Sequence, residues 1–219
     1  MYNVEVIDTW KAHYGQIKDK IQERLKEFRN LWEHASDERL FAEFVFCHLT
    51  PQSKAKVCWN AVLCLMEKEL LLYGSEEDIK ECLKGVRFKN NKAKYIVNSR
   101  EKFWSYPGGF RNFLKDIGIE KDIITTREFL VKHVKGMGYK EASHFLRNIG
   151  FGKDIAILDR HILKNLWRVG AIDSIPSSLS RKKYLEIEMS MRDLSSNINI
   201  PMDHLDLLLW YLEAGEVFK

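Results

Sequence analysis

The sequence predicts an all-α protein in which two helical lobes meet at a cleft that carries a helix-hairpin-helix motif. Apolar residues recur at spacings of three and four along most of the chain, and no useful run has the alternating period of a strand. Glycine, proline and capping residues separate the segments at intervals typical of helices. A chain of 219 residues, of which 45% are hydrophobic and 30% charged, can bury two cores of ordinary size.

The first helix is expected over residues 9–33, with Thr9 as its N-cap. Its other face is highly charged, so we expect one side to be buried and one to face solvent. The residues expected to face the core recur every three or four positions: Ile17, Ile21, Leu25, Phe28 and Leu31.

Cap and turn signals predict the remaining helices. Thr50 and Pro51 predict an N-cap and a first helical residue for a helix that runs to about residue 72. Thr125 and Glu128 predict a capping box for the helix over 126–134. Helical patterns also cover 37–48, 75–85, 91–104, 111–117, 139–149, 160–169, 181–195 and 202–214.

Both chain ends are expected to contribute to one lobe. The chain is predicted to cross between the lobes near residue 35 and again near 150–160. Residues 36–150 would form a barrel-like helical domain that contains the hairpin. Residues 1–35 and 151–219 would form the second helical domain.

Composition excludes several classes of protein. The N-terminal segment has acidic residues and no small-residue cleavage site, and no stretch is long enough to span a membrane, so a cytoplasmic protein is expected, associated with the nucleoid if the source is prokaryotic. The formal charge of +4 is a mild excess that favours polyanionic partners without identifying one. The sequence therefore predicts neither a secreted nor a membrane protein.

The four cysteines do not predict a metal site. Their spacing resembles neither a paired CxxC site nor the disulfide framework of a small secreted domain. We therefore expect buried thiols, with no metal and no cofactor, at Cys47, Cys58, Cys64 and Cys82.

The segment TTREFLVKHVKGMGYKEASHFLRNIG is the most informative part of the chain. Two amphipathic helices flank Gly136, Met137 and Gly138, and the glycines permit positive φ and close approach of another backbone. The amides at the start of the second helix suit a phosphate group, so these three residues are expected to bind the DNA backbone without reading sequence. The alternative is that the glycines only link two core helices.

Two further residues make this signal more specific. Lys140 follows the hairpin in GMGYKEA, and Asp159 lies nineteen residues later in AILDRHI. This arrangement resembles the helix-hairpin-helix DNA glycosylases, whose bifunctional members have a lysine and an aspartate at these points. The segments Leu49-Thr50-Pro51-Gln52-Ser53 and VRFKNNKAKYIVNSR, the lack of C-terminal cysteines and the terminal lysine resemble the type 2 8-oxoguanine DNA glycosylases most.

The resemblance implies a bifunctional DNA glycosylase/AP lyase that removes oxidised guanine from duplex DNA and acts as a monomer. An amine that attacks C1′ of the deoxyribose displaces the base and forms a Schiff base, and lysine is the side chain that can do so. Lys140 would be this nucleophile. Asp159 would stabilise the positive charge that develops on the sugar. Taken singly, Lys140 could be a solvated helix residue and Asp159 a simple N-cap.

The resemblance also implies roles for other residues. His161 would contact a phosphate beside the lesion, although a single histidine more often satisfies a local hydrogen bond. Gln52 would fill the gap left by the extruded nucleotide, and a cap or surface amide is the alternative. Trp210 would stack on the oxidised base and Lys219 would recognise it; the alternatives are a core tryptophan and a frayed chain end.

A basic segment from Gly85 to Arg100 is expected to contact DNA. It contains five basic residues and no acidic residue, and we expect Lys92 in particular to bind the backbone. A solvated helix face is the alternative. Its basic residues are Arg87, Lys89, Lys92, Lys94 and Arg100.

Three other functions are compatible with parts of the pattern. A non-catalytic module could use the hairpin only to hold phosphate, and it would need neither Lys140 nor Asp159. A related glycosylase could act on another damaged base, although such relatives commonly carry the cysteine cluster missing here. A helical interaction scaffold would leave both the hairpin and the basic segment unexplained.

Overall fold

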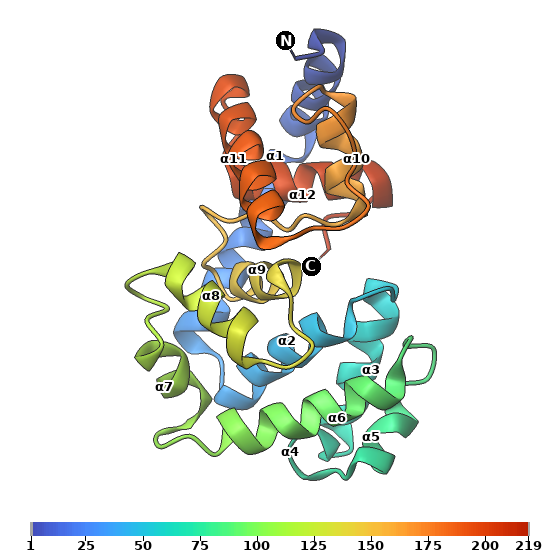
Figure 1. The fold of residues 1–219 in the computed structure, drawn as a ribbon, viewed down its shortest axis with the longest axis vertical. Helices are drawn as coiled ribbons and strands as arrows, with labels where there is room; N and C mark the ends of the chain where they lie inside the picture. The colour runs from blue at the N-terminus through green and yellow to red at the C-terminus, as the bar shows by residue number, and fades with distance from the viewer. Residues whose placement is uncertain (1, 219) are drawn as a thin grey trace.

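The computed structural model describes residues 2–218, and the regular structure in that range consists of helices alone, which confirms the predicted all-α class. Figure 1 shows two groups of helices stacked along the long axis, with α1, α10, α11 and α12 in the upper group and α2 to α8 in the lower. Helix α9 lies where the two groups meet. The helices are α1 Val4–His34, α2 Asp37–Leu49, α3 Ala55–Glu67, α4 Leu70–Tyr73, α5 Glu76–Cys82, α6 Lys89–Ser99, the π-helix η1 Arg100–Trp104, α7 Gly109–Asp116, α8 Ile123–His133, α9 Tyr139–Asn148, α10 Arg160–Arg168, α11 Arg181–Ile198 and α12 Met202–Ala214.

Each group of helices has its own hydrophobic core. In the lower group, the ring of Phe44 lies 5.2 to 5.8 Å from the rings of Phe41, Phe110 and Phe145. This core is formed by residues between 40 and 155. The upper core is formed by residues between 10 and 28 and between 156 and 209. This distribution supports the proposed division into a central domain and a domain made from both chain ends.

Helix α1 packs against both cores. Trp10, Ile17 and Phe28 are buried in the upper core. Near the end of α1, Trp32 packs on the lower core and its ring lies 5.2 Å from that of Phe151. The long amphipathic helix predicted from the sequence therefore ties the two lobes together.

The predicted N-caps of α1 and α8 are wrong. Helix α1 begins earlier than expected, because the side chain of Asn3 accepts a hydrogen bond from the amide of Val6, and Thr9 lies inside the helix. Helix α8 is capped by Asp122, whose carboxylate accepts from two amides of the first turn. Glu128, the other half of the predicted capping box, instead accepts a hydrogen bond from the hydroxyl of Tyr139.

The segment after α2 also differs from the prediction. Thr50 is the C-cap of α2, and its hydroxyl donates to the carbonyl of Cys47. A turn over 50–53 follows, so α3 begins only at Ala55. The expected long helix also ends early at Glu67, and Glu69 has φ +57° before the short helix α4. The turn over 50–53 faces a cleft between the two groups of helices.

The expectation of four buried thiols is correct for only two cysteines. Cys64 in α3 and Cys82 in α5 form a disulfide, because the packing of these helices brings their Cα atoms to 5.7 Å. Cys47 and Cys58 are buried thiols. The pairing depends on tertiary packing, which cysteine spacing in the sequence does not show.

Within residues 2–218, no helix combines the length and the apolar character needed to cross a bilayer.

Candidate active site

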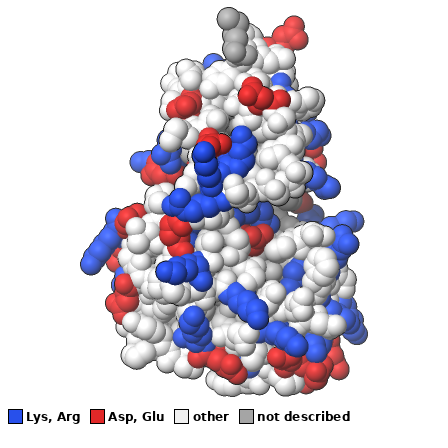
Figure 2. Space-filling model, in the orientation of Figure 1, with Lys and Arg blue, Asp and Glu red and all other residues white. Residues whose placement is uncertain are grey.

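A cleft of about 880 Å³ is lined by residues from both groups of helices. Figure 2 shows Lys and Arg side chains gathered at the waist between the two groups and along the face of the lower lobe, with acidic side chains among them. The cleft is lined by the turn after α2, the first turns of α9 and α10, and the inner face of α12. Its lining residues include Thr50, Gln52, Arg87, Lys140, Arg147, Asp159, His161, Asp206 and Trp210.

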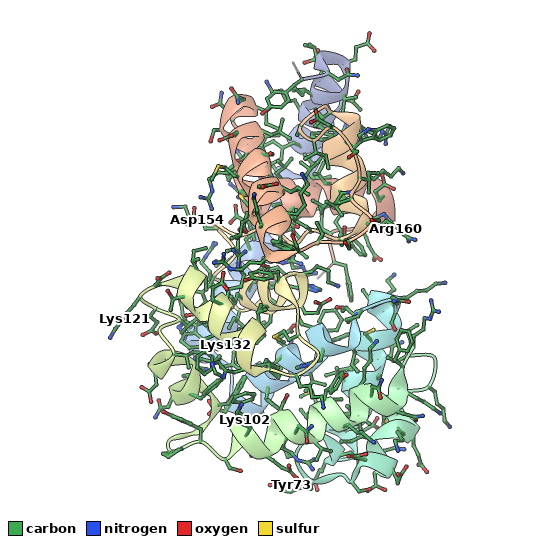
Figure 3. The ribbon with its side chains drawn as sticks, viewed as in Figure 1. Tyr73, Lys102, Lys121, Lys132, Asp154 and Arg160 are labelled. Carbon is green, nitrogen blue, oxygen red and sulfur yellow. A yellow bond between two sulfur atoms is a disulfide. The ribbon has the colours of Figure 1, made fainter. Side chains whose placement is uncertain are left out.

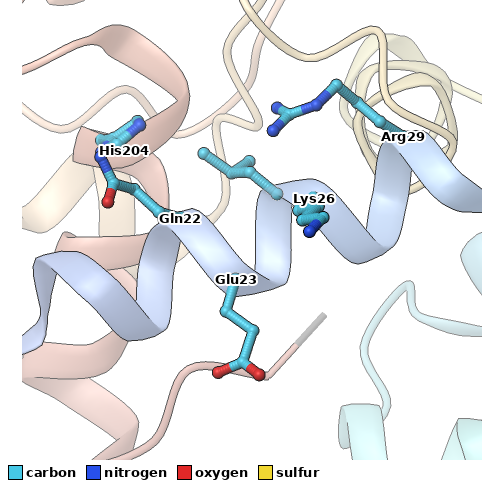
Figure 4. A pocket seen from close by; sticks show the side chains of 6 residues that line it. Gln22, Glu23, Lys26, Arg29 and His204 are labelled. Atoms are coloured by element: carbon cyan, nitrogen blue, oxygen red, sulfur yellow. The ribbon is translucent and has the colours of Figure 1, made fainter.

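A smaller hollow lies beside α1. Figure 4 shows Gln22 near His204, while Glu23 points away to the other side of the helix. Its other lining residues are Leu25, Lys26 and Arg29. None of these residues was predicted to act in catalysis or DNA binding, whereas Lys140 and Asp159 both line the larger cleft, which is therefore the candidate site.

The hairpin between α8 and α9 depends on one of its two glycines for its backbone conformation. Gly136 has φ +83°, and a Cβ atom there would lie 2.4 Å from the ring of Tyr95, so a side chain has no room. Gly138 is the N-cap of α9 with φ −94°, a conformation open to other residues. Of the two glycines that permit positive φ, only Gly136 therefore adopts it.

The middle residue of the hairpin is part of the core. The side chain of Met137 is 4% exposed and packs in the lower core, and its amide donates to the carbonyl of Val134. The side chain of Met137 is therefore not available to DNA. The amide of Gly138 donates to the carboxylate of Glu141, which closes the first turn of α9.

Lys140 is the second residue of α9 and its side chain lies at the cleft with 23% of its surface exposed. Its Nζ lies 3.3 Å from Oγ1 of Thr50 and 3.1 Å from Oε1 of Glu141. The turn after α2 thus supplies a hydroxyl that orients the amine. This partly buried position differs from that of a lysine extended into bulk water.

Asp159 is the N-cap of α10 and lines the same cleft. Its Oδ1 accepts hydrogen bonds from the amides of His161 and Ile162, both at 2.8 Å. Its Oδ2 accepts from Nε1 of Trp210 at 3.2 Å. These three donors fix the direction of the carboxylate at the positive end of α10. Asp159 is therefore both a helix cap and a cleft residue.

Other predicted residues also reach the cleft. His161 is 35% exposed, and its Nδ1 lies 3.6 Å from the carboxylate of Glu213. Gln52 has φ +53°, a conformation that is strained for a residue other than glycine, asparagine or aspartate. Trp210 lines the cleft beside Asp159. Lys219 lies outside the described residues.

Lys92 does not occupy the position expected for a phosphate-binding residue. It is 4% exposed, and its Nζ donates to the carbonyls of Leu49 and Pro51, each at 2.8 Å, and to Oγ of Ser53 at 3.2 Å. Because the chain leaves α2 in a turn, these oxygens accept no hydrogen bond from the backbone of a following helical turn. The buried ammonium donates to them instead. Burial lowers the pKa of Lys92 to about 8.

The exposed basic residues of the same segment fit the expected role better. Arg87 lines the cleft, and Lys89 and Lys94 are exposed. The basic segment therefore presents charge to solvent through residues other than Lys92.

Sequence reasoning missed a buried charged pair in the wall of the cleft. Nη1 of Arg147 lies 3.8 Å from Oδ2 of Asp206, and both side chains are 5% exposed or less. Burial raises the pKa of Asp206 to about 7, against the opposing effect of Arg147. The signal available in the sequence was an aspartate that interrupts the apolar run HLDLLLW.

These features define a class of protein. A helix-hairpin-helix whose second helix presents a lysine to a cleft, with a helix-capping aspartate on the wall of that cleft, is typical of the helix-hairpin-helix DNA glycosylases. The sequence profile of the family described as 8-oxoguanine DNA glycosylase matches residues 21–200. The chain belongs to this family.

Individual relatives match over nearly the whole chain. The 8-oxoguanine DNA glycosylase/AP lyase of Fusobacterium nucleatum is 50% identical over 214 residues, which cover 94% of each chain. The protein of the same name from Methanocaldococcus jannaschii is 43% identical, again over 94% of each chain.

Solved structures agree with the fold. The 8-oxoguanine DNA glycosylase of Thermotoga maritima superposes with a TM-score of 0.86 at 34% identity, covering 98% of this chain and 99% of the other. The M. jannaschii enzyme in complex with a 15mer DNA containing 8-oxoguanine also gives 0.86, at 38% identity, covering 98% of this chain and all of the other.

Proposed function

We propose that this chain removes 8-oxoguanine from duplex DNA and then cleaves the strand at the resulting site, as a bifunctional DNA glycosylase/AP lyase in base excision repair. The observation that carries the proposal is that Lys140 and Asp159 line one cleft beside the hairpin. Family membership and near-complete coverage by relatives of this name support the substrate.

Lys140 acts as the nucleophile. Its neutral Nζ attacks C1′ of the damaged nucleotide, a C–N bond forms, and the bond from C1′ to the base breaks with its electron pair leaving on the base. The departing base takes up a proton. Glu141, whose carboxylate lies 3.1 Å from Nζ, is placed to accept the proton that the ammonium must lose before attack.

Opening of the sugar ring then gives a Schiff base between Nζ and C1′. Loss of a proton from C2′ allows the bond from C3′ to its oxygen to break, and the 3′ phosphate leaves with those electrons. Lysine is suited to both halves of the reaction because one amine first displaces the base and then activates the sugar for elimination.

Asp159 stabilises the positive charge that develops on the sugar. Its carboxylate is held by two backbone amides and the indole of Trp210, so it does not need to reorient during the reaction. The same indole bond fixes the ring of Trp210 at the cleft, where it stacks on the extruded base. Lys219 recognises the oxidised edge of that base.

The duplex is held by its backbone. The first turn of α9 directs its amides and the positive end of the helix dipole at a phosphate, and His161 contacts another. Gln52 enters the space left by the extruded nucleotide. Arg87, with the exposed lysines after it, supplies the sequence-independent attraction. The enzyme acts as a monomer on the DNA of the cytoplasm or nucleoid.

An incision assay separates this function from its alternatives. Duplexes that carry 8-oxoguanine, thymine glycol or an abasic site are incubated with the protein. We expect cutting of the 8-oxoguanine and abasic duplexes and an intact thymine glycol duplex. Cutting of thymine glycol in preference to 8-oxoguanine would indicate a different lesion, and binding without cutting of any duplex would indicate a non-catalytic module.

A further inference from the structure

A buried polar network joins three parts of the chain beside the cleft. Arg127 of α8 is fully buried, and its guanidinium forms two hydrogen bonds to the carboxylate of Glu188 in α11, at 2.5 and 2.8 Å. The same guanidinium donates to the hydroxyl of Ser143, one turn beyond Lys140 in α9. Burying an ion pair of this kind has a high desolvation cost, which the hydrogen bonds of the network must offset.

The network ends on the segment that leads to Asp159. Residues 153–158 are not helical, yet Ile155, Ala156, Ile157 and Leu158 are at most 6% exposed. Buried backbone groups outside a helix need partners from elsewhere. Figure 3 shows Asp154 and Arg160, which flank this segment, at the level where the two lobes meet.

One face of α11 supplies these partners. Glu188 Oε1 accepts from the amide of Ala156 at 3.0 Å. The hydroxyl of Tyr184 donates to the carbonyl of Ala156 at 2.7 Å and accepts from the amide of Leu158 at 3.3 Å. Arg192 donates to the carbonyl of Asp154 at 2.6 Å. Tyr184, Glu188 and Arg192 are spaced by four residues and so form one stripe along the helix.

The network also reaches the helix that carries the nucleophile. The ring of Tyr139, the residue before Lys140, lies 5.3 Å from that of Tyr184. The guanidinium of Arg127 lies 5.6 and 5.8 Å from these two rings, within the range of a cation–π contact. Helix α9 and the segment before Asp159 are therefore fixed to the same set of side chains.

We propose that Tyr184, held with Glu188 and Arg127, is a positioning residue that sets Asp159 against Lys140 across the cleft. The proposal rests on the catalytic roles proposed for these two residues. Tyr184 is 2% exposed and does not line the cleft, and its hydroxyl reaches Asp159 through the backbone of the segment 156–158. A displacement of about 1 Å of a catalytic group can cost on the order of 100-fold in rate.

Tyr184→Phe tests the proposal because it keeps the ring and its packing and removes only the bridging hydroxyl. Single-turnover excision of 8-oxoguanine is measured with enzyme in excess. We expect a rate about 10- to 100-fold lower than that of the wild type. The Kd for the lesion duplex, measured in a Lys140→Gln background, stays within about twofold. Tyr14→Phe is the matched control, since it removes a single hydroxyl contact, to His204, in the same lobe.

A double-mutant cycle shows whether the effect passes through Asp159. In an Asp159→Asn background, Tyr184→Phe is expected to change the rate by less than about twofold, because the two changes act on the same group. Equal losses in both backgrounds, or an unchanged rate in Tyr184→Phe alone, would overturn the proposal. Full activity of Asp159→Asn would instead remove Asp159 from the proposed mechanism, and this proposal with it.

Amide hydrogen exchange gives a measurement that does not depend on catalytic activity. The amide of Leu158 is bonded to Tyr184 Oη, so we expect it to exchange about tenfold faster in Tyr184→Phe and unchanged in Tyr14→Phe. An unchanged exchange rate at Leu158 in Tyr184→Phe would show that the hydroxyl does not hold the segment.

Discussion

Replacing Lys92 by methionine distinguishes a structural lysine from one that binds phosphate. The substitution keeps most of the side-chain volume and removes the ammonium that donates to the carbonyls of Leu49 and Pro51. Loss of the charged donor from these carbonyls costs about 1 to 3 kcal/mol, since only the weaker hydrogen bonds from Cys58 Sγ to Leu49 and from Ser53 Oγ to Pro51 remain. Relief from burying a charged group offsets part of this cost, so we expect a net loss of about 2 kcal/mol in the free energy of unfolding. For a chain of this length, that corresponds to a fall in Tm of about 4 to 8 °C.

The assay combines thermal unfolding with DNA binding at several salt concentrations. The matched control is Lys94→Met, which removes an exposed charge two residues along the same helix. Lys92→Met should lower Tm and leave the salt dependence of Kd unchanged, whereas Lys94→Met should leave Tm unchanged. If Lys92→Met instead reduced the salt slope by about one and left Tm unchanged, Lys92 would contact a phosphate and the structural role would be refuted.

Three further predictions concern other parts of the chain. Burial raises the pKa of Asp206 to about 7, so the folded state keeps a proton that the unfolded state loses near pH 4. The wild type should therefore lose stability relative to Asp206→Asn between pH 4 and 7, by on the order of 4 kcal/mol, and no further above pH 7. A stability difference that stays constant with pH in chemical denaturation would contradict this. Reduction of the Cys64–Cys82 disulfide, which spans 18 residues, should lower the free energy of unfolding by about 3 kcal/mol, and denaturation curves that coincide with and without reductant would show otherwise. Deletion of Lys219 should slow excision of 8-oxoguanine while cleavage of an abasic site is retained; unchanged discrimination between 8-oxoguanine and guanine would remove Lys219 from lesion recognition.

Periodicity was sufficient to predict the helices, whereas their ends depended on contacts that periodicity does not contain. Ile17, Ile21, Leu25 and Phe28 are buried as predicted, and Leu31 is partly buried against the same core, because a spacing of three and four places these residues on one face of α1. The cap of α8 was misplaced because Asp122 and Thr125 are both good capping residues, and only the path of the chain decides between them. The pairing of Cys64 with Cys82 likewise depends on how α3 packs on α5.

The candidate site was predictable where local sequence carries the chemistry. Lys140 and Asp159 each stand beside a recognisable backbone feature, a glycine hairpin and a helix start, and both features are where they were expected. Lys92 was misinterpreted because a basic segment gives no indication of which of its residues turns inward. Arg147 and Asp206 come from helices distant in sequence, and nothing local to either predicts their pairing.

Borohydride trapping tests the central claim most directly, because it captures the Schiff base between Nζ and the sugar. Wild-type protein with an 8-oxoguanine duplex and borohydride should give a covalent adduct. Lys140→Gln should bind the same duplex and give none, whereas Lys121→Gln, which changes an exposed lysine of the lower lobe, should trap like the wild type. A Lys140→Gln protein that still formed the adduct would show that another amine is the nucleophile.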